Sequence, residues 1–468
     1  MTLGLAASLG ASGCTDDQGD PAGPGPDPAT LVRIDAEPEG PNCPAGGAAI
    51  LTGLDRDRDG YLDDDEVTST QYVCNGDDPV QCDGGTVVTG PVTIATAADW
   101  TQLDGATCID GDLLVSGATG ATIPPLPELG IVTGDVIVAA SKLTTLAGLE
   151  ALRWVGDTVL VQGNPALVDL DGLGRLTRVY AMTIVGNDAL VDLRGLEPIV
   201  TFPGSLSISN NTQLASLDGL DNLRAIERTF TIRGNPALTS VAALDELRSV
   251  ALVDISGNRA LTEVDLPIEQ SSSRLILSNN AALTRLAFPA LLGTGDFMQF
   301  DGNGALATIE LPQAVTSGGL VVTGSNSLTR LSLPALRFVT GRVNLTTLPV
   351  LTTIELDALV SIAGDLTVRA AAQLADLTGL GALATVGGAM TVASNPALLS
   401  FAGAGALAQV AGDLSITGNA QLASYAGLDA LTTVGEDFVV MGNPQLPVPT
   451  SEAFAAGLTI VGTTTIAP

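Results

Sequence analysis

Two apolar patterns alternate along most of the chain and repeat with a regular period. They are clearest near the C-terminus, where GDLTVRAAAQLADLTGLGALATVG (364–387) and GDLSITGNAQLASYAGLDALTTVG (412–435) align residue for residue. Each unit begins with a two-residue alternation, as in Leu366 and Val368, which is typical of a strand, and continues with leucines about three residues apart. The period of 22 to 24 residues indicates a solenoid, because one unit cannot bury its apolar side alone. The chain is therefore predicted to be all-β, with a β-solenoid of about 15 coils over residues 86–468.

An asparagine recurs just after the strand of each unit, where the chain must turn inward. The positions are Asn164, Asn187, Asn211, Asn235, Asn258, Asn280, Asn303, Asn395, Asn419 and Asn443. The amide can form hydrogen bonds with the coils above and below, each contributing on the order of 1 kcal/mol. A glycine usually precedes it and allows a corner conformation that other residues resist. At Ser325, Leu348 and Ala371 another residue stands where the repeat predicts asparagine. We interpret this as sequence variation that the repeat tolerates, rather than as a bend or a site.

The residue between the two core positions of each strand is expected to face solvent. In the first three coils these residues are Leu114, Ile137 and Leu160, an apolar strip that a solvated sheet rarely leaves bare. We expect the strip to be covered, either by the N-terminal segment folding back or by a partner. One charged residue, Asp254, occurs in this series. Because glycoside hydrolysis needs two carboxylates at a defined separation, an enzyme of that class is disfavoured.

Composition narrows the function further. The formal net charge of -32 disfavours nucleic acid as a partner, because phosphates would face carboxylates. The chain contains no histidine, so zinc sites and His-dependent triads lose their usual residue. No catalytic residue is predicted.

The first fourteen residues, MTLGLAASLGASGC, form a short apolar run that ends in small residues before Cys14. This run resembles the end of a bacterial lipoprotein signal peptide over residues 1–13 and implies attachment to a membrane through lipid on Cys14. It lacks a positive segment, which a chain start downstream of the true one would explain. The alternative is a frayed apolar terminus with a chance cysteine. Residues 14–41 are rich in Pro, Gly and Asp and are predicted to be a disordered tether.

Four further cysteines form an even set, as expected in an oxidising compartment. They are Cys43, Cys74, Cys82 and Cys108. Three pairings are possible, and we favour Cys43 with Cys74 and Cys82 with Cys108 because each pair closes a local loop.

Between the first two of these cysteines, the stretch DRDRDGYLDDDE (55–66) has the spacing of a calcium loop. Calcium takes six to eight oxygen ligands, and this spacing supplies them at the usual loop positions. The predicted ligands are Asp55, Asp57, Asp59, the Tyr61 carbonyl, Asp63 through a water, and bidentate Glu66. Gly60 permits the sharp turn, and Leu62 can anchor the loop inward. The flanking residues favour short strands over paired helices, so we predict a structural Ca²⁺ site in a cysteine-bracketed module over residues 42–85; a solvated acidic turn is the alternative.

On these residues the repeat region, from about Ala106 to the C-terminus, resembles the receptor L domains, a leucine-rich-repeat-like family of right-handed single-stranded β-helices. Its opening CIDGDLLVSG, from Cys108, is similar to the cysteine-initiated first coil of that family. The resemblance implies a right-handed solenoid that binds a protein through its exposed surface. An ordinary leucine-rich repeat has Leu two residues after the Asn, whereas Leu422 comes three after Asn419, so a helical horseshoe is disfavoured. The calcium-loop segment resembles a small module found near the N-terminus of predicted bacterial lipoproteins.

These features together predict a lipid-anchored, calcium-stabilised protein of the bacterial outer membrane or cell surface, which presents a β-solenoid to an unknown protein or glycan ligand. Two alternatives stay open: a carbohydrate-active β-helix enzyme, and a rigid stalk without a ligand.

Overall fold

The computed structural model describes residues 30–37, 47–54, 56, 62–63, 65–74, 82, 84–117 and 120–468. The chain divides into two compact units between Asp78 and Pro79. Both are built from β-strands, as predicted. Over the described ranges, no helix is both long and apolar enough to span a bilayer.

The N-terminal unit is a three-stranded antiparallel sheet in the order β1-β2-β3. Its strands are β1 (Thr30–Glu37), β2 (Gly47–Leu54) and β3 (Val67–Cys74). Gly47 pairs with Cys74 and Gly53 with Val67, so the predicted calcium loop connects two neighbouring antiparallel strands. Strand β1 lies within residues 14–41, for which a tether was predicted; its sequence TLVRIDAE contains aliphatic and β-branched residues that favour a strand.

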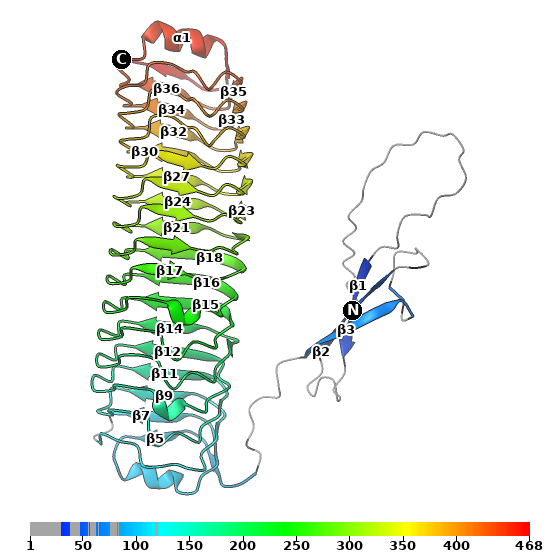
Figure 1. The fold of residues 1–468 in the computed structure, drawn as a ribbon, viewed down its shortest axis with the longest axis vertical. Coiled ribbons are helices and arrows are strands. Elements are labelled where there is room, and N and C mark those ends of the chain that lie inside the picture. Colours follow the sequence, from blue (N-terminus) through cyan, green and yellow to red (C-terminus); the bar gives the residue numbers. More distant parts are fainter. Residues whose placement is uncertain are drawn as a thin grey trace. The chain divides into compact units, whose positions relative to one another are not determined.

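The C-terminal unit is a parallel β-solenoid of about 16 turns, close to the 15 predicted (Figure 1). Each turn contributes one strand to the main face, and neighbouring strands pair in direct register, as Val136 does with Leu113 and Val159. The main-face strands are β5 (Val92–Ile94), β7 (Leu113–Ser116), β9 (Val136–Ala139), β11 (Thr158–Gln162), β12 (Ala181–Val185), β14 (Leu206–Ser209), β15 (Ala225–Arg233), β16 (Ser249–Ser256), β18 (Gln270–Ser278), β21 (Met298–Asp301), β24 (Leu320–Thr323), β27 (Val343–Thr346), β30 (Leu366–Arg369), β32 (Met390–Ala393), β34 (Leu414–Thr417), β36 (Phe438–Met441) and β38 (Thr464–Ile466).

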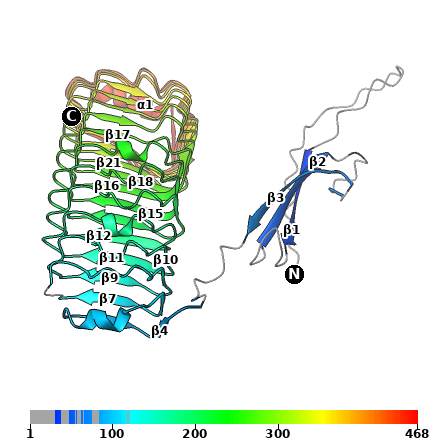
Figure 2. The same cartoon turned by 60° about the horizontal axis from the view of Figure 1, so that its bottom comes forward.

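A second face precedes the main face in every turn and is made of shorter strands. Figure 2 shows β10 around the corner of the solenoid from β9, β11 and β12. The long strands β15, β16 and β18 run around this corner and belong to both faces. The other second-face strands are β4 (Val87–Thr89), β6 (Cys108–Asp110), β8 (Ile131–Val132), β10 (Trp154–Val155), β13 (Thr201–Phe202), β20 (Gly293–Thr294), β23 (Thr316–Ser317), β26 (Phe338–Val339), β29 (Ser361–Ile362), β31 (Thr385–Val386), β33 (Gln409–Val410), β35 (Thr433–Val434) and β37 (Thr459–Ile460).

The third face takes two forms. In the coils that we call glycine-corner coils, such as 374–386, buried leucines stand three residues apart and the chain turns at a glycine with positive φ, here Gly379 at 103°. The other form occurs in coils that we call proline-corner coils, such as 328–339, where Pro334 stands at the turn. There the buried Leu331 and Leu333 are two residues apart, and this alternation forms a strand. The third-face strands are β17 (Glu263–Asp265), β19 (Arg285–Ala287), β22 (Thr308–Glu310), β25 (Arg330–Ser332) and β28 (Thr353–Glu355).

The asparagine ladder is confirmed. Every predicted asparagine is at most 2% exposed. Asn235 is representative: its Nδ2 donates to the Ile208 carbonyl at 3.0 Å, and its Oδ1 accepts the Asn211 N–H at 3.0 Å. The glycine before the asparagine has a positive φ, for example 65° at Gly234. At the positions without asparagine, Leu348 and Ala371 are fully buried, so apolar side chains take the place of the amide, while the Ala371 N–H still donates to the Asn395 Oδ1 at 3.0 Å.

A ladder of aspartates, for which no role was predicted, holds the corner between the second and main faces. The Asp112 Oδ1 accepts the Asp135 N–H at 2.9 Å, and the Asp135 Oδ1 accepts the Thr158 N–H at 2.8 Å. At the other end, the Asp437 Oδ1 accepts the Thr463 N–H at 2.7 Å, and this bond, followed by the Thr463 hydroxyl, lowers the pKa of Asp437. The Gly-Asp pairs that begin several of the repeats, such as Gly111-Asp112 and Gly364-Asp365, are its sequence pattern.

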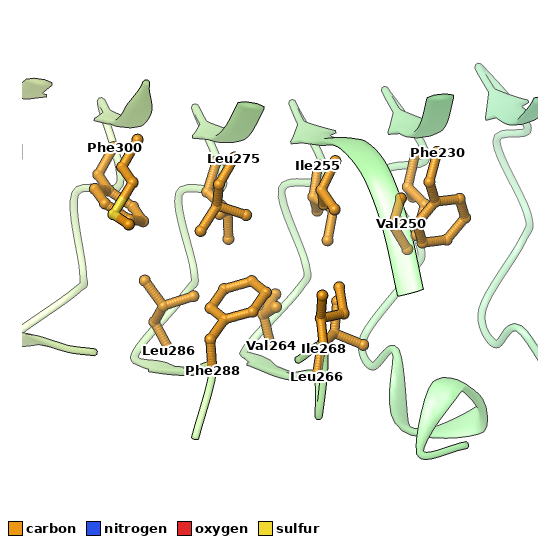
Figure 3. Close-up of a cluster of buried hydrophobic side chains, with 14 of the residues drawn as sticks. Phe230, Val250, Ile255, Val264, Leu266, Ile268, Leu275, Leu286, Phe288 and Phe300 are labelled. Atoms are coloured by element: carbon orange, nitrogen blue, oxygen red, sulfur yellow. The ribbon is translucent and has the colours of Figure 1, made fainter. Parts of the chain in front are cut away.

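The side chains of the faces meet in one continuous aliphatic interior. Figure 3 shows Val264, Leu286 and Phe288 of the third face opposite Ile255 and Leu275 of the main face. The shorter 3₁₀ elements are η1 (Asp99–Leu103), η2 (Asp171–Leu173) and η3 (Ala242–Leu244).

Both ends of the solenoid carry a cap. At the N-terminal end, η1 buries Trp100 and Leu103. At the C-terminal end lies the helix α1 (Val448–Ala456), whose Phe454 ring stacks on Tyr425 with centroids 4.0 Å apart. The caps cover apolar side chains that a bare terminal coil would expose to water.

Candidate binding face

The predicted calcium loop is described in part. Asp55, Asp57, Asp59 and Tyr61 lie outside the described residues. The loop begins after β2 and ends before β3, so strands flank it, as predicted. Leu62 is 4% exposed, in agreement with its predicted anchoring role, and its carbonyl accepts a hydrogen bond from Arg33 of β1 at 2.5 Å.

Glu66, the predicted bidentate ligand, is buried at the base of the loop with 3% exposure. Its Oε1 accepts the Arg56 N–H at 2.5 Å, and its Oε2 accepts the Asp63 N–H at 3.2 Å. Both carboxylate oxygens are thus held by the loop backbone. A buried carboxylate is stabilised by a cation, so this placement fits a calcium ligand at the last position of the loop.

One predicted disulfide is present, between Cys82 and Cys108, whose Cα atoms are 5.6 Å apart. Both cysteines belong to the unit that contains the solenoid. Cys74 ends β3 opposite Gly47. Cys43, its predicted partner, and Cys14, the predicted lipid attachment site, lie outside the described residues.

The predicted apolar strip on the main face is aligned in space. Leu114 pairs with Ile137, and Ile137 with Leu160, in successive parallel strands, and all three side chains are half-buried. Asp254, the charged residue of the same series, is held by Arg233, with Arg233 Nη2 2.6 Å from Asp254 Oδ2, and by the Ser256 hydroxyl. Asp254 is therefore part of an ion pair on this face.

The second face, for which no role was predicted, exposes large apolar side chains. They are Val87, Trp154, Val200, Leu292, Val315 and Phe338, each between 36% and 52% exposed. Tyr180, 40% exposed, lies at the adjoining corner before β12. Three of the apolar residues come from successive coils: the Val315 N–H donates to the Leu292 carbonyl at 2.8 Å, and the N–H of Arg337, directly before Phe338, donates to the Val315 carbonyl at 2.8 Å. The other three lie in earlier coils, with one or more coils between each of them.

Arginines occupy the same face. They are Arg153, Arg178, Arg224, Arg248 and Arg337. The Arg178 guanidinium lies 5.8 Å from the centre of the Trp154 ring, and that of Arg337 lies 5.6 Å from the centre of the Phe338 ring. These cation-π contacts order both partners at the surface. We call the combined set the arginine-aromatic strip; its members are Arg153, Trp154, Arg178, Tyr180, Val200, Arg224, Arg248, Leu292, Val315, Arg337 and Phe338.

A pattern for this strip exists in the sequence. Five triplets of the sequence contain it: RWV, RVY, RAI, RSV and RFV. In each triplet, the arginine comes one or two residues before a buried residue of the second face. The sequence prediction considered the outward positions of the longer, main-face strands. Aligning the repeats on the short strand would have placed the arginines in neighbouring columns.

No curated protein matches the chain. Among solved structures, the crystal structure of a TLR13-ssRNA13 complex matches at 11% identity over 73% of this chain and 75% of that chain, with a TM-score of 0.15. Residues 30–74, from the first residue of β1 to the last of β3, match the model of a domain of unknown function, DUF7151.

Proposed function

We propose that the protein binds an extended partner along the arginine-aromatic strip, with the solenoid as its rigid support. The observation that carries this proposal is the stacking of exposed apolar rings and arginines on one face of a chain whose net charge is -32. Successive coils of a parallel sheet are about 4.8 Å apart, so the strip offers closely spaced contacts over many coils, interrupted by the exposed Glu269 in the coil between Arg248 and Leu292. Aromatic residues and arginine are enriched at recognition surfaces, because they combine apolar area with a polar or charged end.

The contacts of Asp254 on the main face favour binding over hydrolysis. Asp254 is engaged by Arg233 and Ser256, which leaves it poorly suited to act as a general acid. Glycosidic hydrolysis uses a pair of carboxylates across the bond that is broken. The binding role therefore ranks above the carbohydrate-active enzyme and above the stalk without a ligand.

The N-terminal part would hold the protein at its place of action. Lipid on Cys14 would attach the chain to the bacterial outer membrane or cell surface. Ca²⁺ held by Asp55, Asp57, Asp59, Tyr61, Asp63 and Glu66 would stiffen the connection between β2 and β3. The buried Glu66 carboxylate and the strands at both ends of the loop support this role.

The binding role is tested with fluorescently labelled full chain added to isolated bacterial envelopes. The double variant Tyr180→Ser with Arg224→Glu changes two exposed strip residues. We expect it to bind at least about tenfold more weakly, since it removes an apolar contact and reverses a charge. The matched control, Ser415→Glu on the main face, should bind like the parent chain. Equal binding of the strip variant and the parent would refute the proposed surface.

The metal and anchor are tested on the same chain. Calcium should raise the temperature at which the N-terminal unit unfolds, chelator should reverse this, and Glu66→Gln should abolish the response. Mass spectrometry of protein extracted from membranes should find lipid on Cys14 and none on Cys14→Ala. A calcium response that survives in Glu66→Gln would contradict the predicted ligand set.

A further inference from the structure

A pocket of about 310 Å³ opens at the N-terminal end of the second face. Its lining includes Gly84, Cys108, Glu128, Ile131, Arg153 and Trp154. The volume is at the lower end of the range found for small-molecule sites, enough for a compact group rather than a large ligand. Because Arg153 and Trp154 also begin the arginine-aromatic strip, the pocket and the strip form one continuous surface.

The disulfide forms one wall of this pocket. Cys108 pairs with Ile131, and Ile131 with Trp154, in successive parallel strands, so the three side chains point to the same side of the sheet. The bond to Cys82 therefore lies on the outer side of the sheet, and Gly84 lines the pocket beside it. The Thr107 hydroxyl lies 3.3 Å from the Gly84 carbonyl and ties the same wall a second time. The wall is thus held in place by covalent and hydrogen bonds.

Trp154 lines the pocket two strands further along the same sheet. The chain has two tryptophans, and Trp100 is 5% exposed in the N-terminal cap, whereas Trp154 is 36% exposed. The Arg178 guanidinium on its ring restricts the orientation of the indole. A ring held in this way binds a flat apolar group at a reduced entropic cost.

Two charged side chains line the pocket, Arg153 and Glu128. Arg153 and Glu128 make no side-chain hydrogen bond or ion pair with any other described residue. The Arg153 guanidinium lies beside Gly130, where an added Cβ would come within 3.1 Å of Nη2. Elsewhere on the solenoid, arginines such as Arg285 and Arg330 are paired with carboxylates. An unpaired guanidinium beside an aromatic wall is a ready site for a carboxylate.

We propose that this pocket binds a uronic-acid unit of an acidic glycan, an inference that rests on the proposed binding role of the second face. The apolar face of the sugar ring packs on Trp154, its carboxylate pairs with Arg153, and its hydroxyl groups donate hydrogen bonds to Glu128. One sugar unit has about the length of one coil spacing, roughly 4.8 Å, so the rest of the glycan runs along the strip toward Arg178 and Arg224. The arginines of the strip then meet the carboxylates that follow.

The test uses the full chain and oligomers of galacturonate, mannuronate and glucuronate. Binding is followed by calorimetry and by tryptophan emission, which reports on Trp154 because Trp100 is buried. We expect at least one acidic oligomer to bind and to shift the emission, while its methyl-esterified form, with the same rings but no charge, binds about tenfold more weakly. Arg153→Met should lose this preference for the acid, and Trp154→Leu should lose binding of both forms.

Controls separate the pocket from general charge effects. Arg369→Met removes an exposed arginine of the main face and should leave binding unchanged. Exchange of Cys82 and Cys108 for serine should weaken binding without changing the preference for the acid. Equal binding of acidic and esterified oligomers, or acid binding that is insensitive to Arg153→Met, would overturn the inference. If no oligomer binds but envelope binding still depends on Tyr180 and Arg224, the pocket inference is wrong and the proposed function stands.

Discussion

The glycine-corner and proline-corner coils enclose the same aliphatic interior with third faces that differ in length by one residue. In 374–386 the buried positions follow each other at intervals of three, and Gly379 makes the turn. In 328–339 one interval is reduced to two, so Leu331 of strand β25 and Leu333, directly after that strand, point to the same side. The spacing of the buried residues, rather than their identity, therefore decides whether this face is a turn or a sheet.

The two coil types also satisfy their surface groups differently. In glycine-corner coils a carboxylate bonds the corner backbone, as the Asp221 Oδ2 accepts the Gly219 N–H at 2.9 Å. In proline-corner coils the outward strand residues form ion pairs between turns. Arg330 lies 2.9 Å from Glu310 of the preceding turn and 2.7 Å from Glu355 of the next. In the proline-corner coils, ion pairs between coils thus take the place of the local carboxylate caps found in the glycine-corner coils.

The largest expected effect comes from Gly427→Ala in a glycine-corner coil. Gly427 has a φ of 101°, and an added Cβ would lie 2.0 Å from the Phe401 carbonyl oxygen of the preceding coil. Strain and backbone displacement should lower the free energy of unfolding by about 3 kcal/mol. Urea unfolding measures the change. Gly405→Ala, with ordinary φ and no atom within 4 Å, should stay within about 0.5 kcal/mol of the parent, and equal loss at both sites would contradict the role of the corner.

The next largest effect is expected from the asparagine ladder. Asn235→Ala leaves the buried Asn211 N–H and Ile208 carbonyl without their partner. The expected loss of unfolding free energy is about 2 kcal/mol. Asn222→Ala, which removes an exposed amide bonded to the Glu197 carbonyl, is the control and should lose less than about 0.5 kcal/mol. A ladder variant as stable as this control would show that the hydrogen bonds contribute little.

A repair of the ladder in a proline-corner coil should stabilise the protein. The Ser325 hydroxyl is buried and has no hydrogen-bond partner among the described residues. Ser325→Asn should extend the ladder from Asn303 and raise the unfolding free energy by about 1 kcal/mol. Ser325→Ala removes the unpaired hydroxyl without adding a hydrogen bond. Its unfolding free energy should lie between those of the parent chain and of Ser325→Asn. If the asparagine variant is less stable than the alanine variant, the space around residue 325 does not accommodate the asparagine side chain.

The smallest effect concerns the ion pairs of the proline-corner coils. Hydrogen bonds from Arg330 and then Ser332 hold the pKa of Glu355 below its ordinary value. The unfolded chain therefore binds this proton more readily, so the stabilisation is present above the ordinary carboxyl pKa and is lost as pH falls through the lowered pKa. Glu355→Gln should cost about 0.5 kcal/mol at neutral pH and progressively less at acid pH. Urea unfolding of the variant and the parent chain at neutral and at acid pH measures the difference.

The repeat itself was predictable from the sequence. The buried leucines, the asparagines and their preceding glycines recur every 22 to 24 residues, because each coil must solve the same packing problem as its neighbours. The Cys82 to Cys108 pair followed from loop closure, although its position in the wall of a pocket did not. The two coil types are also present in the sequence as spacings of three and two, yet the two repeats that show the pattern most clearly, 364–387 and 412–435, are both of the glycine-corner type.

The outward-facing residues could not be predicted in this way, because no requirement for burial makes them recur with a period. Trp154 and Arg178 are 24 positions apart in sequence and become ring and cation in one contact only when two coils stack. Arg153 and Glu128 converge on the disulfide in the same way. The interior of the solenoid can therefore be predicted from the chain alone, because burial requires the same residue types in every coil. Which surface residues become neighbours depends on the register between coils, and this register exists only in the folded solenoid.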